Sequence, residues 1–246
     1  MKFILFVLTT LISHSLLANY DLYVPTKAGT SPILIFVHGG AWISGGREDY
    51  KKMAQSLAQS EVCVVTAGYR LAPGAQHPLP VEDLDETIQR VSKLKEPKCD
   101  ARRVFLVGHS AGAHMIAFWN TQFKSSSVKG FVGVEGIYDL PALSKRWPAY
   151  KDWFLDKAFG SEKGWEKASP ANLPQVSKGP WLLIHSKKDE LVDIGQTQSF
   201  ERALRSQKIR VSVEMLKAES HFGAIEALSD AKSVTRNALR KFIRNN

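Results

Sequence analysis

The stretch Gly108-His109-Ser110-Ala111-Gly112 decides the fold because of what stands on either side of it. The apolar run 104–107 before it indicates a buried strand, and the apolar segment 113–119 after it indicates a helix. A serine between glycines on a sharp strand-to-helix turn is typical of a nucleophile elbow, where the hydroxyl lies beside a helix N-terminus. Ser110 is therefore the candidate nucleophile. An ordinary glycine and serine turn without chemistry is the alternative.

A second glycine-containing turn, His38-Gly39-Gly40-Ala41-Trp42, follows the apolar strand predicted for residues 33–37. Ligands of parallel α/β sheets bind where the strands end. Acyl transfer generates an oxyanion, which backbone N–H groups aimed in advance can stabilise. We expect the amides of Gly40 and Ala41 to form this oxyanion hole with the amide of Ala111. A tight turn that binds nothing is the alternative for this stretch alone.

The general base is predicted by chain order, since proteins with this elbow place the acid and then the histidine after the serine. Three histidines follow Ser110, namely His114, His185 and His221. His114 lies one turn along the nucleophile helix, where we expect it to pack against the sheet, and His185 ends a predicted strand. His221 follows the strand-like run 211–216, in a loop from which a base can reach the serine. It is the candidate base.

The orienting acid is expected in the loop after the predicted strand 181–184, which offers Asp189, Glu190 and Asp193. A fixed carboxylate holds the imidazole in the required tautomer and stabilises the imidazolium. Asp189 comes soonest after the strand end, where the loop is still held by the sheet. We therefore predict Asp189 as the acid, while solvated surface charge is the alternative for all three.

Several further segments match a known superfamily. They are Tyr69-Arg70-Leu71-Ala72-Pro73, His77-Pro78-Leu79-Pro80, Gly136-Ile137-Tyr138-Asp139-Leu140, the segment from His185 to Asp189, and His221-Phe222-Gly223. With both glycine turns, they make the chain resemble the α/β-hydrolase superfamily. Within it, the chain resembles esterases related to hormone-sensitive lipase and the kynurenine formamidases, or arylformamidases. The resemblance covers nearly all of residues 20–244. It departs at Ala41, where many esterases have a third glycine and the formamidases have a variable residue followed by tryptophan.

Composition and pattern predict one α/β domain of this kind. The chain has 246 residues, of which 44% are hydrophobic and 23% charged, enough for one buried core. Strand and helix segments alternate, which predicts a mostly parallel sheet with helices on both faces. The predicted elements include a helix over 50–58, a strand over 62–66 and a helix over 81–94 that Pro80 begins. Residues 141–174 are rich in aromatic side chains and are expected to form a small cap insertion.

The first residues are interpreted separately from the domain. Lys2 is followed by a largely apolar stretch that ends at Ala18, before the polar Asn19. This order is typical of a secretory signal peptide. We therefore predict a signal peptide over residues 1–18, a hydrolase domain over 19–246 with no stable membrane insertion after cleavage, and a periplasmic or secreted location. An uncleaved anchor and a buried N-terminal element are the alternatives.

The formal net charge of +9 raises the question of an anionic partner. The positive residues are scattered and no nucleic-acid-binding motif is present, so we expect no nucleic-acid partner. In the last predicted helix the basic residues are expected to form an ordinary solvated face; they are Lys232, Arg236, Arg240, Lys241 and Arg244.

Cys63 and Cys99 are the two cysteines of the chain. A third strand normally separates their strands in this fold, which places the strand starts about 9–10 Å apart. That distance exceeds the Cα separation of about 7 Å that a disulfide usually spans, unless the loop at Cys99 crosses over. One disulfide and two free buried thiols both remain open.

The combined motifs predict a serine hydrolase that cleaves small carboxylic esters through an acyl-enzyme, with Ser110, Asp189 and His221 as its triad. No metal ion or organic cofactor is expected. Trp42 and Tyr138 are predicted to crowd the substrate pocket and to keep its acyl side short. An arylformamidase is the alternative, although predicted export counts against it. The resemblance also allows a polysaccharide acetyl or feruloyl esterase, and a catalytically inactive binding protein is the alternative outside enzymes.

Overall fold

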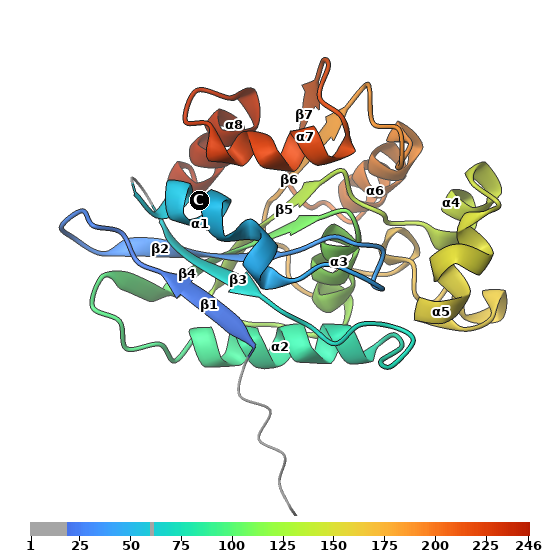
Figure 1. The fold of residues 1–246 in the computed structure, drawn as a ribbon, viewed down its shortest axis with the longest axis horizontal. Coiled ribbons are helices and arrows are strands. Elements are labelled where there is room, and N and C mark those ends of the chain that lie inside the picture. The colour runs from blue at the N-terminus through green and yellow to red at the C-terminus, as the bar shows by residue number, and fades with distance from the viewer. Residues whose placement is uncertain (1–18, 60–61) are drawn as a thin grey trace, which may run out of the picture.

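A seven-stranded sheet forms the centre of the computed structural model, which describes residues 19–59 and 62–246 (Figure 1). The strand order is β1-β3-β2-β4-β5-β6-β7, and every neighbouring pair is parallel except β1 with β3. The strands are β1 Tyr20–Tyr23, β2 Ser31–Val37, β3 Cys63–Ala67, β4 Cys99–His109, β5 Val128–Val134, β6 Trp181–Ser186 and β7 Val211–Leu216. The predicted mostly parallel sheet is confirmed.

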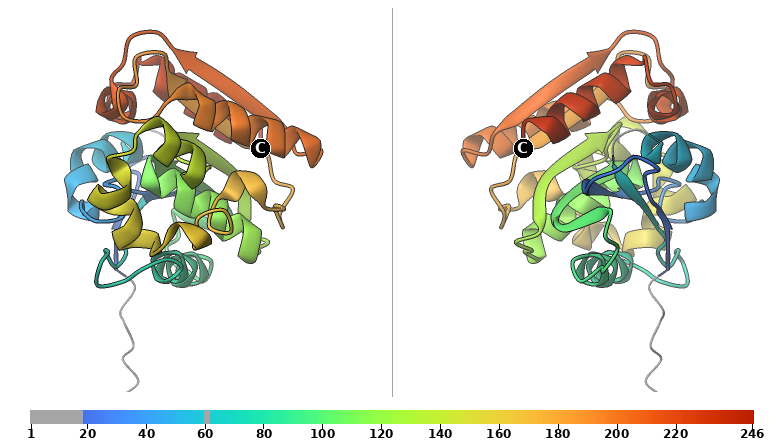
Figure 2. Two further views of the ribbon diagram at one scale, coloured as in Figure 1. Left: turned by 90° about the vertical axis from the view of Figure 1, so that its right-hand side faces the viewer. Right: turned by 90° about the vertical axis from the view of Figure 1, so that its left-hand side faces the viewer.

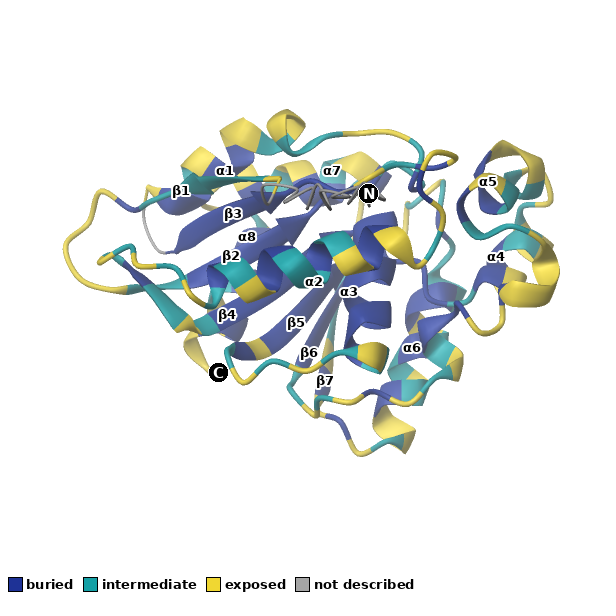
Figure 3. Ribbon diagram, turned by 90° about the horizontal axis from the view of Figure 1, so that it is seen from below, coloured by how far each residue is buried: buried dark blue, intermediate teal, exposed yellow. Residues whose placement is uncertain are grey.

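Helices cover both faces of this sheet (Figure 3). One face packs against α1 (Lys51–Ala58), α7 (His221–Glu226) and α8 (Val234–Arg244), and the other against α2 (Leu79–Val91), α3 (Ala111–Gln122) and α6 (Ile194–Ser206). Successive side chains of a strand point to opposite faces. In β2, Leu34 therefore packs in the core under α1, while Ile35 packs in the core under α2 and α3. The predicted α/β-hydrolase architecture thus has two apolar cores.

The segment between β5 and β6 stands apart from these layers (Figures 1 and 2). It contains α4 (Leu140–Arg146), a π-helical turn at Lys151–Leu155, α5 (Asp156–Phe159) and 3-10 turns at Glu162–Gly164 and Pro170–Asn172. Further 3-10 turns lie at Arg47–Tyr50 and Ala227–Ser229. Phe154 and Trp165 are buried within the segment expected to be a cap. These aromatic residues extend the apolar core under α2 and α3, and Phe154 and Phe159 contact Trp42.

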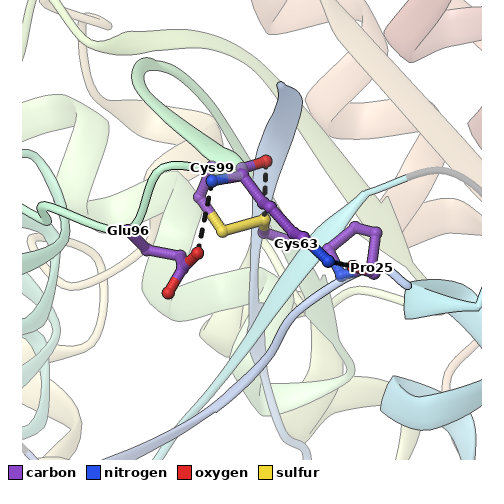
Figure 4. Close-up of a disulfide and its surroundings, with 5 residues drawn as sticks. Pro25, Cys63, Glu96 and Cys99 are labelled. Carbon is purple, nitrogen blue, oxygen red and sulfur yellow. Dashed lines mark hydrogen bonds between the residues drawn. A yellow bond between two sulfur atoms is a disulfide. The ribbon is translucent and has the colours of Figure 1, made fainter. Parts of the chain in front are cut away.

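A disulfide joins Cys63 of β3 to Cys99 of β4 (Figure 4). The strand β2 does separate these two strands, yet the two Cα atoms lie 5.8 Å apart, closer than the 9–10 Å expected for a flat sheet. The register between β2 and β4 shifts after Pro32, because Asp100 faces Pro32 whereas Val104 faces Ile33. This irregularity displaces the first residues of β4 and accounts for the short distance.

Two further expectations concern the chain ends. Arg236 of α8 is buried and donates hydrogen bonds to Ser56 Oγ, Ser56 O and Leu228 O, so the prediction that it belongs to a solvated face is wrong. Through these hydrogen bonds its guanidinium connects α8 to α1.

The predicted signal peptide lies outside the described residues. Among the helices that the structure describes, none combines the length and the apolar character that crossing a membrane requires.

Candidate active site

Ser110 occupies a strained turn between β4 and α3. Its φ of 53° and ψ of −116° lie in a region that residues other than glycine rarely adopt. The turn also packs very closely on β2, because a Cβ atom added to Gly112 would lie 2.1 Å from the carbonyl oxygen of Val37. The amide of Ser110 donates to Val134 O of β5 at 2.9 Å, which fixes the turn against the sheet. The elbow geometry thus depends on glycine at 112.

The turn after β2 is strained as well. Gly40, Ala41 and Trp42 have φ values of 105°, 52° and 61°. The carbonyl oxygen of Gly40 accepts hydrogen bonds from the amides of Ile43 and Ser44, both at 3.0 Å. Among the described residues, the amides of Gly40, Ala41 and Ala111 have no hydrogen-bond acceptor. These three amides were predicted for the oxyanion hole, and they remain available to a substrate oxygen.

His221 and Asp189 form a direct pair. The Nδ1 atom of His221 lies 2.8 Å from Asp189 Oδ2, while Asp189 Oδ1 accepts the amides of Leu191 and Val192 at 2.8 and 2.9 Å. Burial alone would raise the pKa of Asp189, but its hydrogen bonds to His221 and Glu135 and to the backbone hold that pKa below the usual value. Asp189 is therefore an ionised acceptor for the imidazole.

The two other acids of this loop have different contacts. Glu190 Oε2 accepts the backbone amide of His221 at 3.1 Å, and Asp193 Oδ1 accepts the amide of Gly195 at 2.9 Å as the N-cap of α6. Of the three candidate acids, the structure thus places Asp189 against the imidazole.

A cavity of about 340 Å³ opens beside these residues. Ser110 and His221 both line it, together with Gly40, Ala41 and Ser44. The remaining lining side chains are apolar or aromatic: Ile43, Ile137, Tyr150, Trp153, Phe154, Leu191, Val192 and Phe222. The volume suits a small ligand. The nucleophile and base predicted from the sequence therefore face one largely apolar cavity.

The prediction that Trp42 and Tyr138 line the pocket is wrong. Trp42 is buried in the core, where its ring packs edge-on against His114 and Phe159. Tyr138 is fully buried and stacks on Phe200 of α6 at 4.2 Å. The left-handed backbone of the β2 turn directs Trp42 inward, and the neighbouring residues Ile43 and Ile137 contact the cavity instead.

Buried histidines also surround the site, among them His109, His114 and His185. His114 Nε2 lies 2.8 Å from Ala168 O of the cap segment, so this residue packs against the cap rather than the sheet alone. His109 of the elbow lies with its Nε2 3.1 Å from His221 O, and burial lowers its pKa to about 3. The neutral ring of His109 therefore supports the backbone of His221. His185 contacts Thr197 and Val192.

Glu135 is the acidic residue of this region that the sequence analysis missed. It follows β5 directly, it is fully buried, and its carboxyl Oε2 lies 3.3 Å from His185 Nδ1. A charged residue immediately after an apolar strand, at the edge where ligands bind, is the signal that could have identified it.

Comparison with known proteins identifies the family. The sequence matches the BD-FAE family over residues 20–204. The chain belongs to the BD-FAE family. It is 30% identical to a kynurenine formamidase of Meyerozyma guilliermondii, over 81% of this chain and 79% of that protein. It is 27% identical to the isoprenylcysteine alpha-carbonyl methylesterase of Arabidopsis thaliana, over 82% of this chain and 53% of that protein.

A solved structure supports the fold. The crystal structure of esterase B from Lactobacillus rhamnosis matches with a TM-score of 0.77 at 20% identity, over 91% of this chain and 79% of that one. The predicted resemblance to the α/β-hydrolase superfamily is confirmed. The relatives of this BD-FAE member are named as hydrolases of esters and formamides.

Proposed function

We propose that this BD-FAE member is a serine hydrolase that cleaves small carboxylic esters. The observation that carries the proposal is the paired His221 and Asp189 beside Ser110, at a cavity that both His221 and Ser110 line. This is the arrangement that nucleophilic acyl transfer requires. The strained backbone of Ser110 agrees with it, since such strain persists mainly at functional sites.

The reaction follows from these positions. His221 accepts the hydroxyl proton of Ser110 as the serine oxygen attacks the ester carbonyl carbon, and Asp189 stabilises the imidazolium. The carbonyl oxygen becomes an oxyanion, which the amides of Gly40, Ala41 and Ala111 stabilise. His221 then protonates the departing alcohol, and water repeats the sequence to release the carboxylic acid and restore the serine. In this scheme His221 accepts and returns the proton in each step.

A fluorophosphonate probe tests the proposal without knowledge of the substrate. The probe phosphonylates an activated serine with loss of fluoride, and the modified peptide should contain Ser110. Labelling of a different residue, or none, would count against a serine hydrolase and favour a binding protein with a hydrolase fold.

An arylformamidase is the second candidate, because the relatives include kynurenine formamidases. Kynurenine carries an ammonium and a carboxylate, whereas the lining side chains in the described part of the chain include no Lys, Arg, Asp or Glu. Trp153 and Phe222 at the cavity are 52% and 51% exposed, which suits stacking on a plain aryl or sugar ring of the alcohol. Parallel assays with phenyl acetate, a feruloyl ester and N-formylkynurenine separate the candidates. Preference for the last would reject the ester proposal.

The small cavity predicts a preference for short acyl groups. Phe154, Ile137 and Leu191 bound a space of about 340 Å³, so we expect p-nitrophenyl acetate or propionate to give higher kcat/KM than octanoate. Each methylene that fitted would add about 0.8 kcal/mol of binding, so a deep pocket would instead give a rising series. The measurement is the series from acetate to octanoate at one pH. A steady rise with chain length would contradict the short pocket.

We also propose that the protein is exported to the periplasm or medium. The order of residues 1–18 supports this, and so does the disulfide between Cys63 and Cys99, since disulfides persist in oxidising compartments. The exported protein is expected to begin at or near Asn19 and to lack the two thiol hydrogens. Intact-mass measurement of the exported protein checks both features. A soluble form that retains Met1 and two free thiols would reject export.

A further inference from the structure

Glu135 has the same uncommon, left-handed backbone conformation as Ser110 and the residues of the proposed oxyanion turn. Among the described residues, five other than glycine have a left-handed φ, and four of them follow the strands β2, β4 and β5: Ala41, Trp42, Ser110 and Glu135. Each such residue costs about 1–3 kcal/mol, and residues of this kind gather at active sites. The φ of 49° at Glu135 thus marks a position that the surrounding structure holds in place.

The carboxyl group of Glu135 lies where three strand-end segments meet. Its Oε1 accepts the amide of Ser186, at the end of β6, at 2.8 Å. The hydroxyl of Ser186 in turn donates to Glu219 O at 2.5 Å, two residues before His221. One carboxyl oxygen of Glu135 also lies within 4.8 Å of a carboxylate oxygen of Asp189. The buried Glu135 side chain therefore lies against the loop that carries Asp189. It also contacts the end of β6, and Ser186 at that end holds the loop before His221.

The contacts of His185 leave Glu135 Oε2 without a hydrogen-bond donor. The Nε2 of His185 lies 3.2 Å from the carbonyl oxygen of Val192, which can only accept, so Nε2 carries the ring hydrogen of a neutral imidazole. The Nδ1 of His185 is then an acceptor, and it accepts the hydroxyl of Thr197 at 2.9 Å, so it gives no hydrogen to Glu135 Oε2 at 3.3 Å. Among the described residues no other donor reaches Oε2, and an ionised carboxyl there would face the carboxylate of Asp189. A hydrogen on Oε2 removes this conflict.

The acceptor sites of Asp189 indicate where that hydrogen is directed. A carboxylate offers about four lone-pair sites. The amides of Leu191 and Val192 take two on Oδ1, and the ring of His221 takes one on Oδ2. The fourth is left for a hydrogen donated by the nearby Glu135. With all four filled, Asp189 has no freedom to turn away from His221.

We propose that Glu135 is a positioning residue that remains a neutral carboxylic acid and donates its hydrogen to Asp189, so that the ionised Asp189 is fixed against His221. This inference rests on the proposed function, because it assigns Glu135 a role in the same reaction. A neutral donor stabilises the carboxylate without adding a second negative charge behind the imidazole.

The electrostatic surroundings agree with a neutral Glu135. Burial, followed by the hydrogen bond to Asp189 and the charge of Asp189, raises the pKa of Glu135 to about 10, although the Ser186 amide opposes the shift. The other titratable groups near it are His185, whose pKa burial lowers, the carboxylate of Glu190 and the phenol of Tyr138. None of these supplies a positive charge at neutral pH.

A bound cation is the competing explanation for this cluster. Glu135, His185 and Asp189 each have a ligand atom within 4.8 Å of the others, so the three could hold a metal ion. Such an ion would compete with His221 for Asp189 and would need the carboxyl of Glu135 ionised. Measuring the metal content of the purified protein, before and after treatment with EDTA, distinguishes a bound metal ion from a neutral Glu135. A stoichiometric metal whose removal lowers activity would overturn the proposal.

Two substitutions test the hydrogen bond. Glu135→Gln keeps the size of the side chain and keeps a neutral donor, so kcat for p-nitrophenyl acetate should stay within about threefold of the wild type. Glu135→Ala removes the donor and should lower kcat by about 10- to 100-fold with KM changed less than about threefold, as for other residues that orient a catalytic group. Asn120→Ala is the matched control, because Asn120 is equally buried and hydrogen-bonded at the far end of α3. It should lower the melting temperature but leave kcat unchanged.

The pH dependence of stability tests the proton itself. A raised folded-state pKa gives stability that is fully present below the unfolded value of about 4.3 and is lost as pH rises toward the folded value. Glutamine does not ionise, so the melting temperature of Glu135→Gln minus that of the wild type should increase steadily from pH 6 to pH 9. This measurement needs only the wild type and the glutamine variant.

The outcomes separate this inference from the proposed function. If Ser110 takes the fluorophosphonate label but Glu135→Ala keeps full kcat, or Glu135→Gln is as slow as Glu135→Ala, the positioning role is rejected while the hydrolase proposal stands. A melting-temperature difference that is flat from pH 6 to pH 9 rejects the neutral acid. Failure of Ser110 to react rejects the proposed function instead.

Discussion

Replacing Ser110 with alanine is expected to lower kcat/KM for p-nitrophenyl acetate by about 10⁴-fold or more while the protein still folds. The hydroxyl oxygen forms the bond to the acyl carbon, and Ser110 lines the same cavity as the proposed base His221. His221→Ala should lose a similar factor, because the hydroxyl then has no proton acceptor. Since the two residues act as a unit, the double variant should be little slower than either single variant.

Steady-state kinetics on wild type and variants check this, with thermal unfolding as the test of folding. Ser56→Ala serves as a control serine, since Ser56 lies on α1 and contacts Arg236 rather than the cavity. It should keep normal turnover. Near-normal ester hydrolysis by Ser110→Ala would remove the basis of the proposed mechanism.

The arrangement of strands and helices could be predicted from the sequence because buried parallel strands are continuous apolar runs. The run predicted over 33–37 lies within β2 (Ser31–Val37), and the helix predicted over 81–94 corresponds to α2 (Leu79–Val91). The short strand β1 (Tyr20–Tyr23) was not predicted. It lies antiparallel at the edge of the sheet, so its pattern alternates weakly and gives little signal.

Side-chain direction in the turns could not be predicted. Trp42 and Tyr138 stand beside cavity residues in the sequence, but both point into the core. In a helix or strand the period of the chain fixes the direction of a side chain, whereas in a turn the local φ and ψ decide it. The left-handed values at Ala41 and Trp42 have no sequence signal beyond the preceding glycines.

Contacts between segments that are distant in the sequence could not be predicted either. The buried Arg236 depends on Ser56 of another helix, and the approach of Cys63 and Cys99 depends on a local register shift. Glu135 acquires its partners from β6 and the Asp189 loop. Chain order selected Asp189 and His221 as a pair, but the hydrogen bonds that hold the acid come from the fold.

Asp189→Asn is expected to lower kcat by about 10²- to 10⁴-fold with little change in KM. The amides of Leu191 and Val192 require an oxygen at the position of Oδ1, so the NH₂ group of asparagine must take the position of Oδ2. It then donates to Nδ1 of His221, which places the ring hydrogen on Nε2. In that tautomer the ring cannot accept the proton of Ser110.

The two neighbouring acids provide the controls. Asp193→Asn should keep kcat within about threefold, because asparagine is as good an N-cap for α6 as aspartate. Glu190→Gln keeps an oxygen for the His221 amide and should also stay close to wild type.

The pH dependence of stability carries a second signature of Asp189. Because the folded-state pKa of Asp189 is lowered, its ionised form stabilises the wild type above the unfolded value of about 3.9, and this contribution is lost as pH falls through that value toward the folded one. The asparagine of the Asp189→Asn variant does not ionise, so the stability gap between wild type and variant should narrow as pH falls from 5 to 3. Near-normal turnover in Asp189→Asn together with a large loss in Glu190→Gln or Asp193→Asn would assign the acid to that neighbour. The Asp189 carboxylate would then hold the loop without orienting the base.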